Sequence, residues 1–487
     1  MRFRIFCTTI VLSLTAFLAS TETFAQAPAA SQSTPSASGV PRTITLDDAI
    51  KAAMARNYTT RLASNQVRKD EFAARSAADN MWLPSVKATG GWQYDYSFNP
   101  IDEEVVQNPF VPVVVNGDTD LVPNPNPTYT RVTAQNGTQS LNYNVGASIN
   151  LFNGFADLAS IHQTEATLGS AQNSLTWTRQ QTADNVVKAY LSILLTQELV
   201  YAADSTLAEA QAQFSLVQGQ YQAGVVAIAQ IYTQQSVVVG DSLALIQADV
   251  NFQNAKVSLL YLLNVPPNQF NNYSFNADGI DTATTPAARA AVDTSIQPEA
   301  INAAIDNRPD ILAQEESIKA SEEVVNITRG QFYPSLDATL GVGGSGSGPN
   351  LTTIHLNNGL NAGLQLTIPI FDKFQTTLTV DEQEVDVENA RITLEQDVQQ
   401  MRSSVTIDVN TLKATEKSLD ATESAFRAAS ESFRLANEQL QVGSGTEVAV
   451  VIAEAALETA RTNRVNAKYN WVLAQKQVAY DLGKWNY

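Results

Sequence analysis

An internal repeat without gaps constrains the fold of this 487-residue chain more than any other feature. Residues from Phe152 onward recur at a constant offset of 219 positions, with no insertion or deletion. A long ungapped duplication rich in helix-forming residues predicts a rigid element whose length is kept in both copies. We therefore expect two copies of one plan. The matching pairs are Phe152 and Phe371, Phe214 and Phe433, Gly224 and Gly443, Ala248 and Ala467, Asn251 and Asn470, Ala255 and Ala474, Tyr261 and Tyr480, and Leu263 and Leu482.

The N-terminus is typical of an exported protein. Residues 1–25 combine Arg2 and Arg4, an apolar stretch and small residues ending at Ala25, the pattern of a secretory signal peptide. The only cysteine, Cys7, lies within it, so the mature chain is expected to have no disulfide and no lipid attachment site. Residues 26–43 are rich in Ala, Ser, Pro and Gln and predict a flexible N-terminal segment.

The charge of the mature chain is strongly negative. Removing Arg2, Arg4 and Glu22 leaves 28 basic and 48 acidic residues, a net charge of 28 − 48 = −20, which disfavours nucleic-acid binding. After the signal no run of about eighteen apolar residues occurs, so we expect no membrane-spanning helix. A role in the membrane would have to use strands.

Each copy is expected to contain a helix, two strands, a long helix and a return helix. Thr45 is a candidate N-cap with Asp48 at the third helical position, and Pro84 ends the first helix after Trp82. The first repeat, 44–264, is expected to contain this helix, strands 85–98 and 140–151, a long helix 153–223 and a return helix 225–264. The second repeat, 298–483, is expected to contain a helix, strands 335–345 and 359–370, a long helix 372–442 and a return helix 444–483, with an equatorial linker 265–297 before it and a tail 484–487 after it.

The four expected strands alternate apolar and polar residues over roughly ten positions, the length of a tilted outer-membrane crossing. Four strands cannot close a barrel, and open edges in lipid leave backbone groups unpaired, so the chain is expected to oligomerise. Three copies would form a twelve-stranded β-barrel with a polar lumen. The fold class is therefore an α+β membrane protein whose barrel continues into long helices. A lipid-facing aromatic girdle is expected from Trp92, Tyr94, Tyr96, Phe98 and Tyr143.

The two connections between strands differ in length. Pro84 to Phe152 spans 68 positions and Pro334 to Phe371 spans 37, so the first connection carries 31 extra residues. Its six prolines between Pro100 and Pro127 predict a long extracellular loop. The glycine-rich segment 341–348 is expected to belong to the shorter loop.

The long helices are the second expected structural element. At about 1.5 Å per residue, the segment 153–223 reaches about 105 Å, enough to cross a periplasm. The opening and return helices together match that length, so they are expected to stack end to end beside it. Two neighbouring apolar stripes on the long helix predict packing between two neighbours: Val187, Leu191 and Leu194, and Val186, Tyr190 and Ile193.

The whole mature chain resembles the TolC-like outer-membrane efflux proteins. Singly these motifs are weak, but their order over about 440 residues is specific. The motifs that carry the resemblance are Leu46-Asp47-Asp48-Ala49-Ile50, Leu83-Pro84-Ser85, Leu151-Phe152-Asn153-Gly154, Gly224-Val225-Val226-Ala227-Ile228, Asn307-Arg308-Pro309-Asp310, Tyr333-Pro334-Ser335 and Ile370-Phe371-Asp372.

The resemblance implies a homotrimer with a β-barrel in outer-membrane lipid, a helical tunnel through the periplasm and a mixed equatorial belt formed by 265–297 and the chain ends. It implies a passive exit duct that serves an inner-membrane pump of the RND or ABC type. A periplasmic adaptor would dock at the tips near Gly224 and Gly443. The implied location is the outer membrane of a Gram-negative-type bacterium.

At the tunnel entrance the chain departs from the family pattern. The positions that match the pore-facing aspartates are Ala449 and Ile452, that of the locking arginine is Gly445, and that of its acidic partner is Gln230. We hypothesise that Glu447 supplies an acidic ring instead. The residues expected to form the adaptor-docking tip and gate are Tyr221, Gly224, Val225, Gln230, Leu440, Gly443, Gly445, Glu447, Ala449 and Ile452.

Other motifs favour no chemistry. Residues 341–346 match a dinucleotide-binding pattern after a strand, but no helix follows, so a hairpin loop is the better interpretation. His162 and His355 have no partners at metal-ligand spacing. We expect no catalytic, cofactor or metal site and no enzyme activity. The predicted function is the exit duct of a tripartite efflux or type I secretion system; the alternative is a periplasm-spanning coiled-coil scaffold or surface adhesin without transport.

Overall fold

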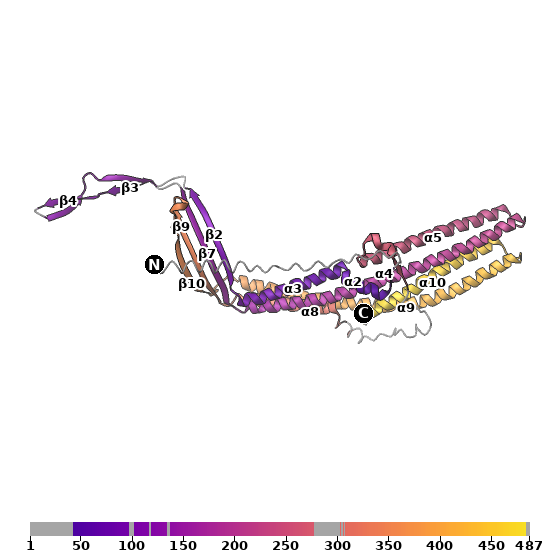
Figure 1. Cartoon of the computed structure of the whole chain (residues 1–487). Coiled ribbons are helices and arrows are strands. Elements are labelled where there is room, and N and C mark those ends of the chain that lie inside the picture. The colour runs from indigo at the N-terminus through magenta and orange to yellow at the C-terminus, as the bar shows by residue number, and fades with distance from the viewer. Residues whose placement is uncertain are drawn as a thin grey trace.

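The computed structural model describes residues 42–96, 102–115, 118–133, 137–276, 302, 305 and 307–483 of an elongated molecule. A bundle of long helices occupies one end, a narrow sheet follows, and a thin ribbon extends beyond the sheet (Figure 1). The predicted signal peptide, Phe98, the larger part of the 265–297 linker, residues 298–301 and the tail 484–487 lie outside the described residues.

The prediction of a single first helix is wrong. The segment divides at Asn57 into α2 (Leu46–Arg56) and α3 (Tyr58–Trp82). The Asn57 side chain accepts a hydrogen bond from Thr59 N at 2.9 Å and donates to Leu262 O at 3.0 Å. Asn57 therefore caps α3 and ties it to the end of the return helix α5 (Ile228–Leu262). The cap at Thr45 is confirmed, since its hydroxyl accepts from Asp48 N at 3.3 Å.

Residues 42 and 43 belong to a strand rather than to a flexible lead-in. Strand β1 (Arg42–Ile44) pairs in parallel with β8 (Tyr273–Phe275), which follows the 3₁₀ helix η1 (Pro267–Asn272). The buried Tyr190 hydroxyl oxygen lies 2.8 Å from Ile44 O and 2.6 Å from Asn276 O, so its one proton can bond either carbonyl and the side chain contacts both segments. The prediction of a flexible segment from composition is therefore wrong for these two residues.

The repeat is visible at the start of each long helix. Helices α4 (Ala156–Gln222) and α9 (Gln375–Gln441) contain 67 residues each, and both begin after a phenylalanine with positive φ, 67° at Phe155 and 61° at Phe374. An edge-to-face contact stabilises each bend, with ring centroids 5.2 Å apart for Phe152 and Phe155. The contact recurs 219 positions later between Phe371 and Phe374, at 5.6 Å.

The helical core surrounds the middle of α4. The two predicted stripes are confirmed as buried: Val186, Tyr190 and Ile193 are fully covered, and Val187, Leu191 and Leu194 nearly so. They pack against α2, the end of α5, the middle of α9 and the last helix α10 (Glu447–Asp481). Helix α8 (Pro309–Gly330) packs along α4 as well. Among the described helices, α4 alone has a stretch long and apolar enough to cross a membrane, on length and composition only; these stripes account for part of that apolarity.

The sheet has the strand order β10-β9-β7-β2, and neighbouring strands are antiparallel. The glycine-rich segment 341–348 lies inside β9, so its interpretation as a loop is wrong. A Cβ atom at Gly343 would lie 2.6 Å from Tyr143 O, and one at Gly346 would lie 2.3 Å from His355 O. Glycine is favoured at these two positions because backbone carbonyl oxygens lie close to them. The strands are β2 (Ser85–Tyr96), β7 (Gly137–Asn153), β9 (Ser335–Gly348) and β10 (Asn357–Thr367), with the 3₁₀ turn η2 (Leu351–Thr353) between the last two.

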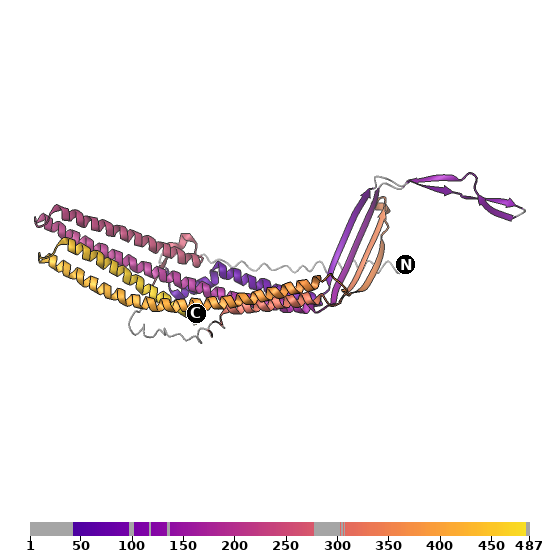
Figure 2. The same ribbon diagram turned by 180° about the vertical axis from the view of Figure 1, so that it is seen from behind.

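The proline-rich connection is also more ordered than expected. In place of an irregular loop, it contains two antiparallel ladders in series, β3 with β6 and β4 with β5. Figure 2 shows the same ribbon from behind, again projecting past the sheet on the side away from the helices. Its strands are β3 (Asp102–Gln107), β4 (Phe110–Val115), β5 (Asp118–Pro123) and β6 (Thr128–Thr133).

Candidate functional site

The register of the sheet sorts its side chains onto one apolar and one polar face. Residues directly opposite each other on paired strands share a face, and alternate residues along a strand change face. One row therefore runs Ala88, Val145, Val342 and Leu360 across all four strands. The polar face includes Ser85, Lys87, Thr89, Asn142, Asn144, Ser148, Asp337, Thr339, Asn361 and Gln365.

The polar face is hollowed and its side chains bond one another. A hollow of about 400 Å³ is lined by residues including Lys87, Asn144 and Asn361. Ser85 Oγ lies 2.8 Å from Ser148 Oγ, and Asn150 donates to Asp337 at 3.0 Å. In a barrel the apolar face must meet lipid, so this face is suited to a water-filled lumen.

The expected aromatic girdle lies on the apolar face. Trp92, Tyr94 and Tyr96 are exposed on the outer half of β2. Tyr143 shares their face, and its hydroxyl donates to Asn358 Oδ1 at 2.7 Å across the glycine at 344. Phe98 lies outside the described residues. The arrangement suits aromatic side chains at a membrane–water interface, although a lipid contact remains a prediction.

Both edges of the sheet are free. On the far sides of β2 and β10 no strand is paired within the described part of the chain. All of β10 and nearly all of β2 is exposed. Such edges cannot face hydrocarbon unpaired, so β2 of one chain must pair with β10 of another.

The two helical hairpins end in turns of the same geometry. Gly224 and Gly443 have φ of 76° and 78°, and each follows a long helix. Val225 N donates to Gln220 O and Ser444 N donates to Gln439 O, both at 2.9 Å, which closes the same C-terminal glycine motif twice. A Cβ atom at either glycine would meet nothing within 4 Å, so the glycine is required by φ alone.

Apolar side chains are exposed around both turns. Val225 is 72% exposed and Val442 is 78% exposed. Tyr221, Ile228, Val448 and Ile452 are exposed as well, whereas Leu440 is half-buried. Grouped apolar side chains on a surface are typical of sites that contact another protein or a membrane.

The positions of the expected charged gate have neutral side chains here. At Gly445 a Cβ atom would lie 2.9 Å from Leu440 N, so a side chain at this position would require the turn to shift. Ala449 and Ile452 are exposed on the first turns of α10. Gln230 is half-buried, and its Oε1 is buried without a hydrogen-bond partner among the described residues.

The hypothesis of an acidic ring at Glu447 does not fit the single chain. Its side chain is 7% exposed, and Oε1 lacks a hydrogen-bond partner within the part of the chain that the structure describes. Burial raises the pKa of this carboxyl. Its place directly after the N-cap Thr446 turns it inward, which a count of positions from Gly443 could not reveal.

A second group of carboxyls, missed in the sequence, lies where α5 and α10 meet α4. Burial, followed by the charges of Asp241 and Glu209, raises the pKa of Glu454 to about 7. Burial and the charge of Glu458 raise the pKa of Asp241. The nearby Arg461 bonds Glu209 at 3.2 Å and Thr206 at 3.0 Å. These residues are dispersed over three helices, so no local motif marks them.

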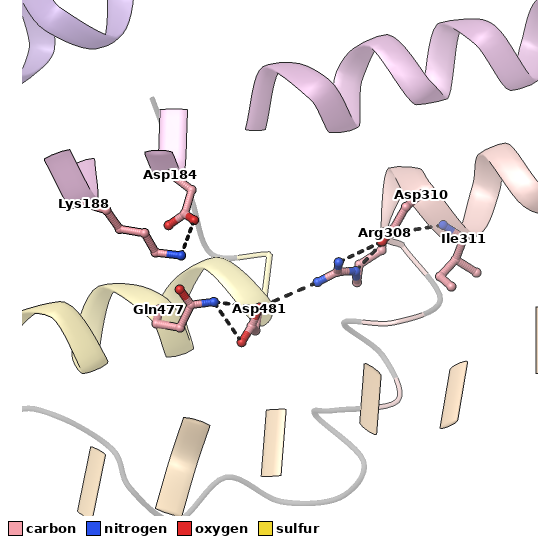
Figure 3. A network of polar contacts seen from close by, with 7 residues as sticks. All are labelled: Asp184, Lys188, Arg308, Asp310, Ile311, Gln477 and Asp481. Carbon is pink, nitrogen blue, oxygen red and sulfur yellow. Dashed lines mark hydrogen bonds and ion pairs between the residues drawn. The ribbon is translucent and has the colours of Figure 1, made fainter. Parts of the chain in front are cut away.

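A polar network surrounds Arg308 at the start of α8, in the middle of the bundle (Figure 3). Arg308 binds Asp310 through two hydrogen bonds of 3.0 and 2.8 Å, and its Nη1 lies 4.0 Å from Asp481 Oδ1. Its guanidinium also stacks over Trp177, 4.4 Å from the ring centroid. Burial, then a hydrogen bond with Asp408, raises the pKa of Asp481. The Asn-Arg-Pro-Asp motif thus fastens the start of α8 to the end of α10.

No group of three or more His, Cys, Asp or Glu suited to a metal occurs among the described residues. His162 lies 4.0 Å from Glu323, which is an ordinary helix–helix contact. The features that the fold assembles are therefore a sheet with free edges, a polar inner face and two exposed tips.

Comparison with known proteins agrees with this geometry. The family model described as outer membrane efflux protein matches residues 50–265 and 300–484. No curated protein is similar enough in sequence to count as a match.

Solved structures share the fold at low sequence identity. The Campylobacter jejuni CmeC outer membrane channel superposes with a TM-score of 0.68 and 16% identity, covering 90% of this chain and 85% of that one. The open state of the Neisseria gonorrhoeae MtrE channel gives 0.65 and 17%, with coverages of 90% and 88%. The Vibrio cholerae outer membrane protein VceC gives 0.64 and 16%, with coverages of 90% and 96%.

These matches resolve the question posed by the free edges. Three chains close a twelve-stranded barrel in the outer membrane, and their helices continue it into the periplasm. With its family model matched across both repeats, the chain belongs to the outer membrane efflux protein family.

Proposed function

We propose that the trimer is the passive exit duct of a tripartite efflux or type I secretion system. An inner-membrane pump of the RND or ABC type supplies the energy, and a periplasmic adaptor connects the pump to the tips of the two hairpins. The observation that carries this proposal is the pair of equivalent turns at Gly224 and Gly443, each surrounded by exposed apolar side chains.

The dimensions of the helices support the proposal. Each 67-residue helix is about 100 Å long at 1.5 Å per residue, so it places the tips far from the outer membrane. The tips are then within reach of proteins anchored in the inner membrane. Family membership favours this duct over a scaffold or adhesin without transport.

Docking at the tips is the second part of the proposal. Tyr221 and Val225 belong to one hairpin and Val448 and Ile452 to the other, so an adaptor would meet two similar sites in each chain. Because both turns have the same backbone geometry, six similar sites surround the end of a trimer. The same end of the tunnel is lined by Ala449, Gln230 and Gly445 in place of the charged gate residues of the family. Opening of the tunnel would then be controlled by side-chain packing and by adaptor binding.

The test is a charge placed on the exposed tip. Val448→Asp should weaken adaptor binding, by about tenfold for each 1.4 kcal/mol that the buried valine contributes to the binding free energy. Cells with this variant should therefore accumulate more dye. Val448→Thr, of nearly the same shape and without charge, is the matched control. Normal trimer levels with unchanged dye efflux and unchanged adaptor cross-linking in Val448→Asp would refute docking at this tip.

A further inference from the structure

The ribbon beyond the barrel has one apolar side that no other described element covers. In the β4–β5 ladder, Phe110 lies opposite Pro123 and Pro112 lies opposite Leu121. These four residues and Val114 share one side of the ribbon, since they occupy alternate positions on paired strands. Val114 is 68% exposed and Leu121 is 65% exposed.

The other side of the ribbon is different in character. It carries Asp118 and Asp120, both exposed, together with the valines at positions 111, 113, 115 and 122. The two sides of the ribbon therefore differ in charge, one having no charged residue and the other two carboxylates, and the ribbon has no core of its own. A two-stranded ribbon is at best marginally stable in water, so an apolar side of this kind needs a partner.

The place where the ribbon is attached indicates its partner. Strand β2 runs toward β3, and β6 runs back toward β7, so the ribbon continues from the strand at the edge of the sheet. That edge pairs with a neighbouring chain in the trimer. Three ribbons consequently rise from three equivalent points on the rim of one barrel, directly beyond an interface between copies.

The distances allow the three ribbons to meet. A twelve-stranded barrel with strands about 4.8 Å apart and tilted by about 40° has a radius of about 12 Å. Two ladders in series, each with six-residue strands, span about 40 Å at about 3.4 Å per residue. The apolar end of each ribbon can therefore reach the threefold axis.

We propose that the ribbon is an interface between copies of this chain, in which the apolar sides of the three β4–β5 ladders pack together beyond the barrel. The side with Asp118 and Asp120 faces solvent. The partner is a second and a third copy of the same ribbon, and the assembly narrows the outer mouth of the duct. This inference depends on the trimer and is independent of any pump or adaptor.

Cysteine cross-linking in intact outer membranes tests the proposal. The chain's one cysteine, Cys7, lies in the predicted signal peptide, so an introduced cysteine is expected to be the only thiol that can cross-link in the mature protein. Leu121→Cys should form covalent dimers on oxidation and covalent trimers with a three-armed maleimide. Asp120→Cys, its neighbour on the opposite side, should cross-link at least about fivefold less, because adjacent residues in a strand face opposite ways.

Labelling supplies a second measurement. A membrane-impermeant maleimide should react at least about fivefold more slowly with Leu121→Cys than with Asp120→Cys in the same trimers, because the interface excludes it. If Leu121→Cys fails to insert, Phe110→Cys on the same side replaces it. Equal cross-linking of both sides, cross-links that join separate trimers, or equal labelling would overturn the proposal. Slow labelling without cross-linking would point to lipid or another protein instead and would also overturn it.

Discussion

Replacing Glu454 with glutamine should stabilise the protein at alkaline pH. The Glu454 carboxyl is 6% exposed, and burial with the neighbouring charges of Asp241, Glu209 and Glu458 raises its pKa from 4.5 to about 7. The cation nearby, Arg461, already binds Glu209. Ionised Glu454 therefore opposes folding, and an uncharged side chain of the same shape removes that opposition.

The sign and size follow from the two pKa values. Below pH 4.5 the carboxyl is protonated in both states, so it contributes nothing to the pH dependence. Between pH 4.5 and about 7 the unfolded chain ionises first, and stability falls as the pH rises; above about 7 the loss is complete. A shift of about 2.5 pKa units corresponds to at most about 3.4 kcal/mol, and to about 2 kcal/mol because solvent screens neighbouring charges such as that of Glu209.

The assay is thermal unfolding of the detergent-solubilised trimer, followed by circular dichroism at one scan rate. An entropy of about 2.1 cal/mol/K per residue makes 2 kcal/mol equivalent to about 2 °C for a chain of this size. Glu454→Gln should raise Tm by about 2 °C at pH 8 and by nearly nothing at pH 4. Glu395→Gln, an exposed glutamate on α9, should change neither value.

Two results would refute this reasoning. An equal gain at pH 4 and pH 8 would mean that ionisation is irrelevant and that the amide simply packs better. A loss of stability at pH 8 would mean that the carboxylate is paired in the folded trimer.

Four further substitutions test other parts of the structure. Arg308→Lys removes the two-bond contact with Asp310 and should destabilise the chain by about 2 to 3 kcal/mol in thermal unfolding; an unchanged Tm would show that this joint is not held by the guanidinium. Asn57→Ala removes the cap of α3 and should cost about 1 kcal/mol by the same assay, and no loss would show that the break does not depend on the cap. Gly224→Ala should cost about 1 kcal/mol through φ alone, and Gly445→Ala should cost more because its Cβ atom would lie 2.9 Å from Leu440 N; equal costs would contradict the steric argument.

The periodic parts of the fold could be predicted from the sequence. The offset of 219 positions indicated paired helices of equal length, and α4 and α9 have 67 residues each. The stripes around Val186 and Val187 predicted burial between two neighbours, because helical periodicity is set by backbone geometry. The trimer followed from four strands that cannot close.

Tertiary contacts decided what the sequence did not reveal. The break at Asn57 depends on a hydrogen bond to Leu262, which is distant in sequence. In the sequence, the glycines of β9 suggest a loop. Only the folded structure shows that other residues, such as Tyr143, lie close against them. The inward orientation of Glu447 and the group around Glu454 likewise arise from helices that meet only in the folded chain.

The equal lengths of α4 and α9 constrain how such a chain can change over time. One residue added to α4 would turn everything below it by about 100° and lower its tip by about 1.5 Å. The tip of α9 would stay where it is, so the two hairpin tips of each chain would be displaced relative to each other. A change in the length of the duct therefore requires the same insertion or deletion in both repeats.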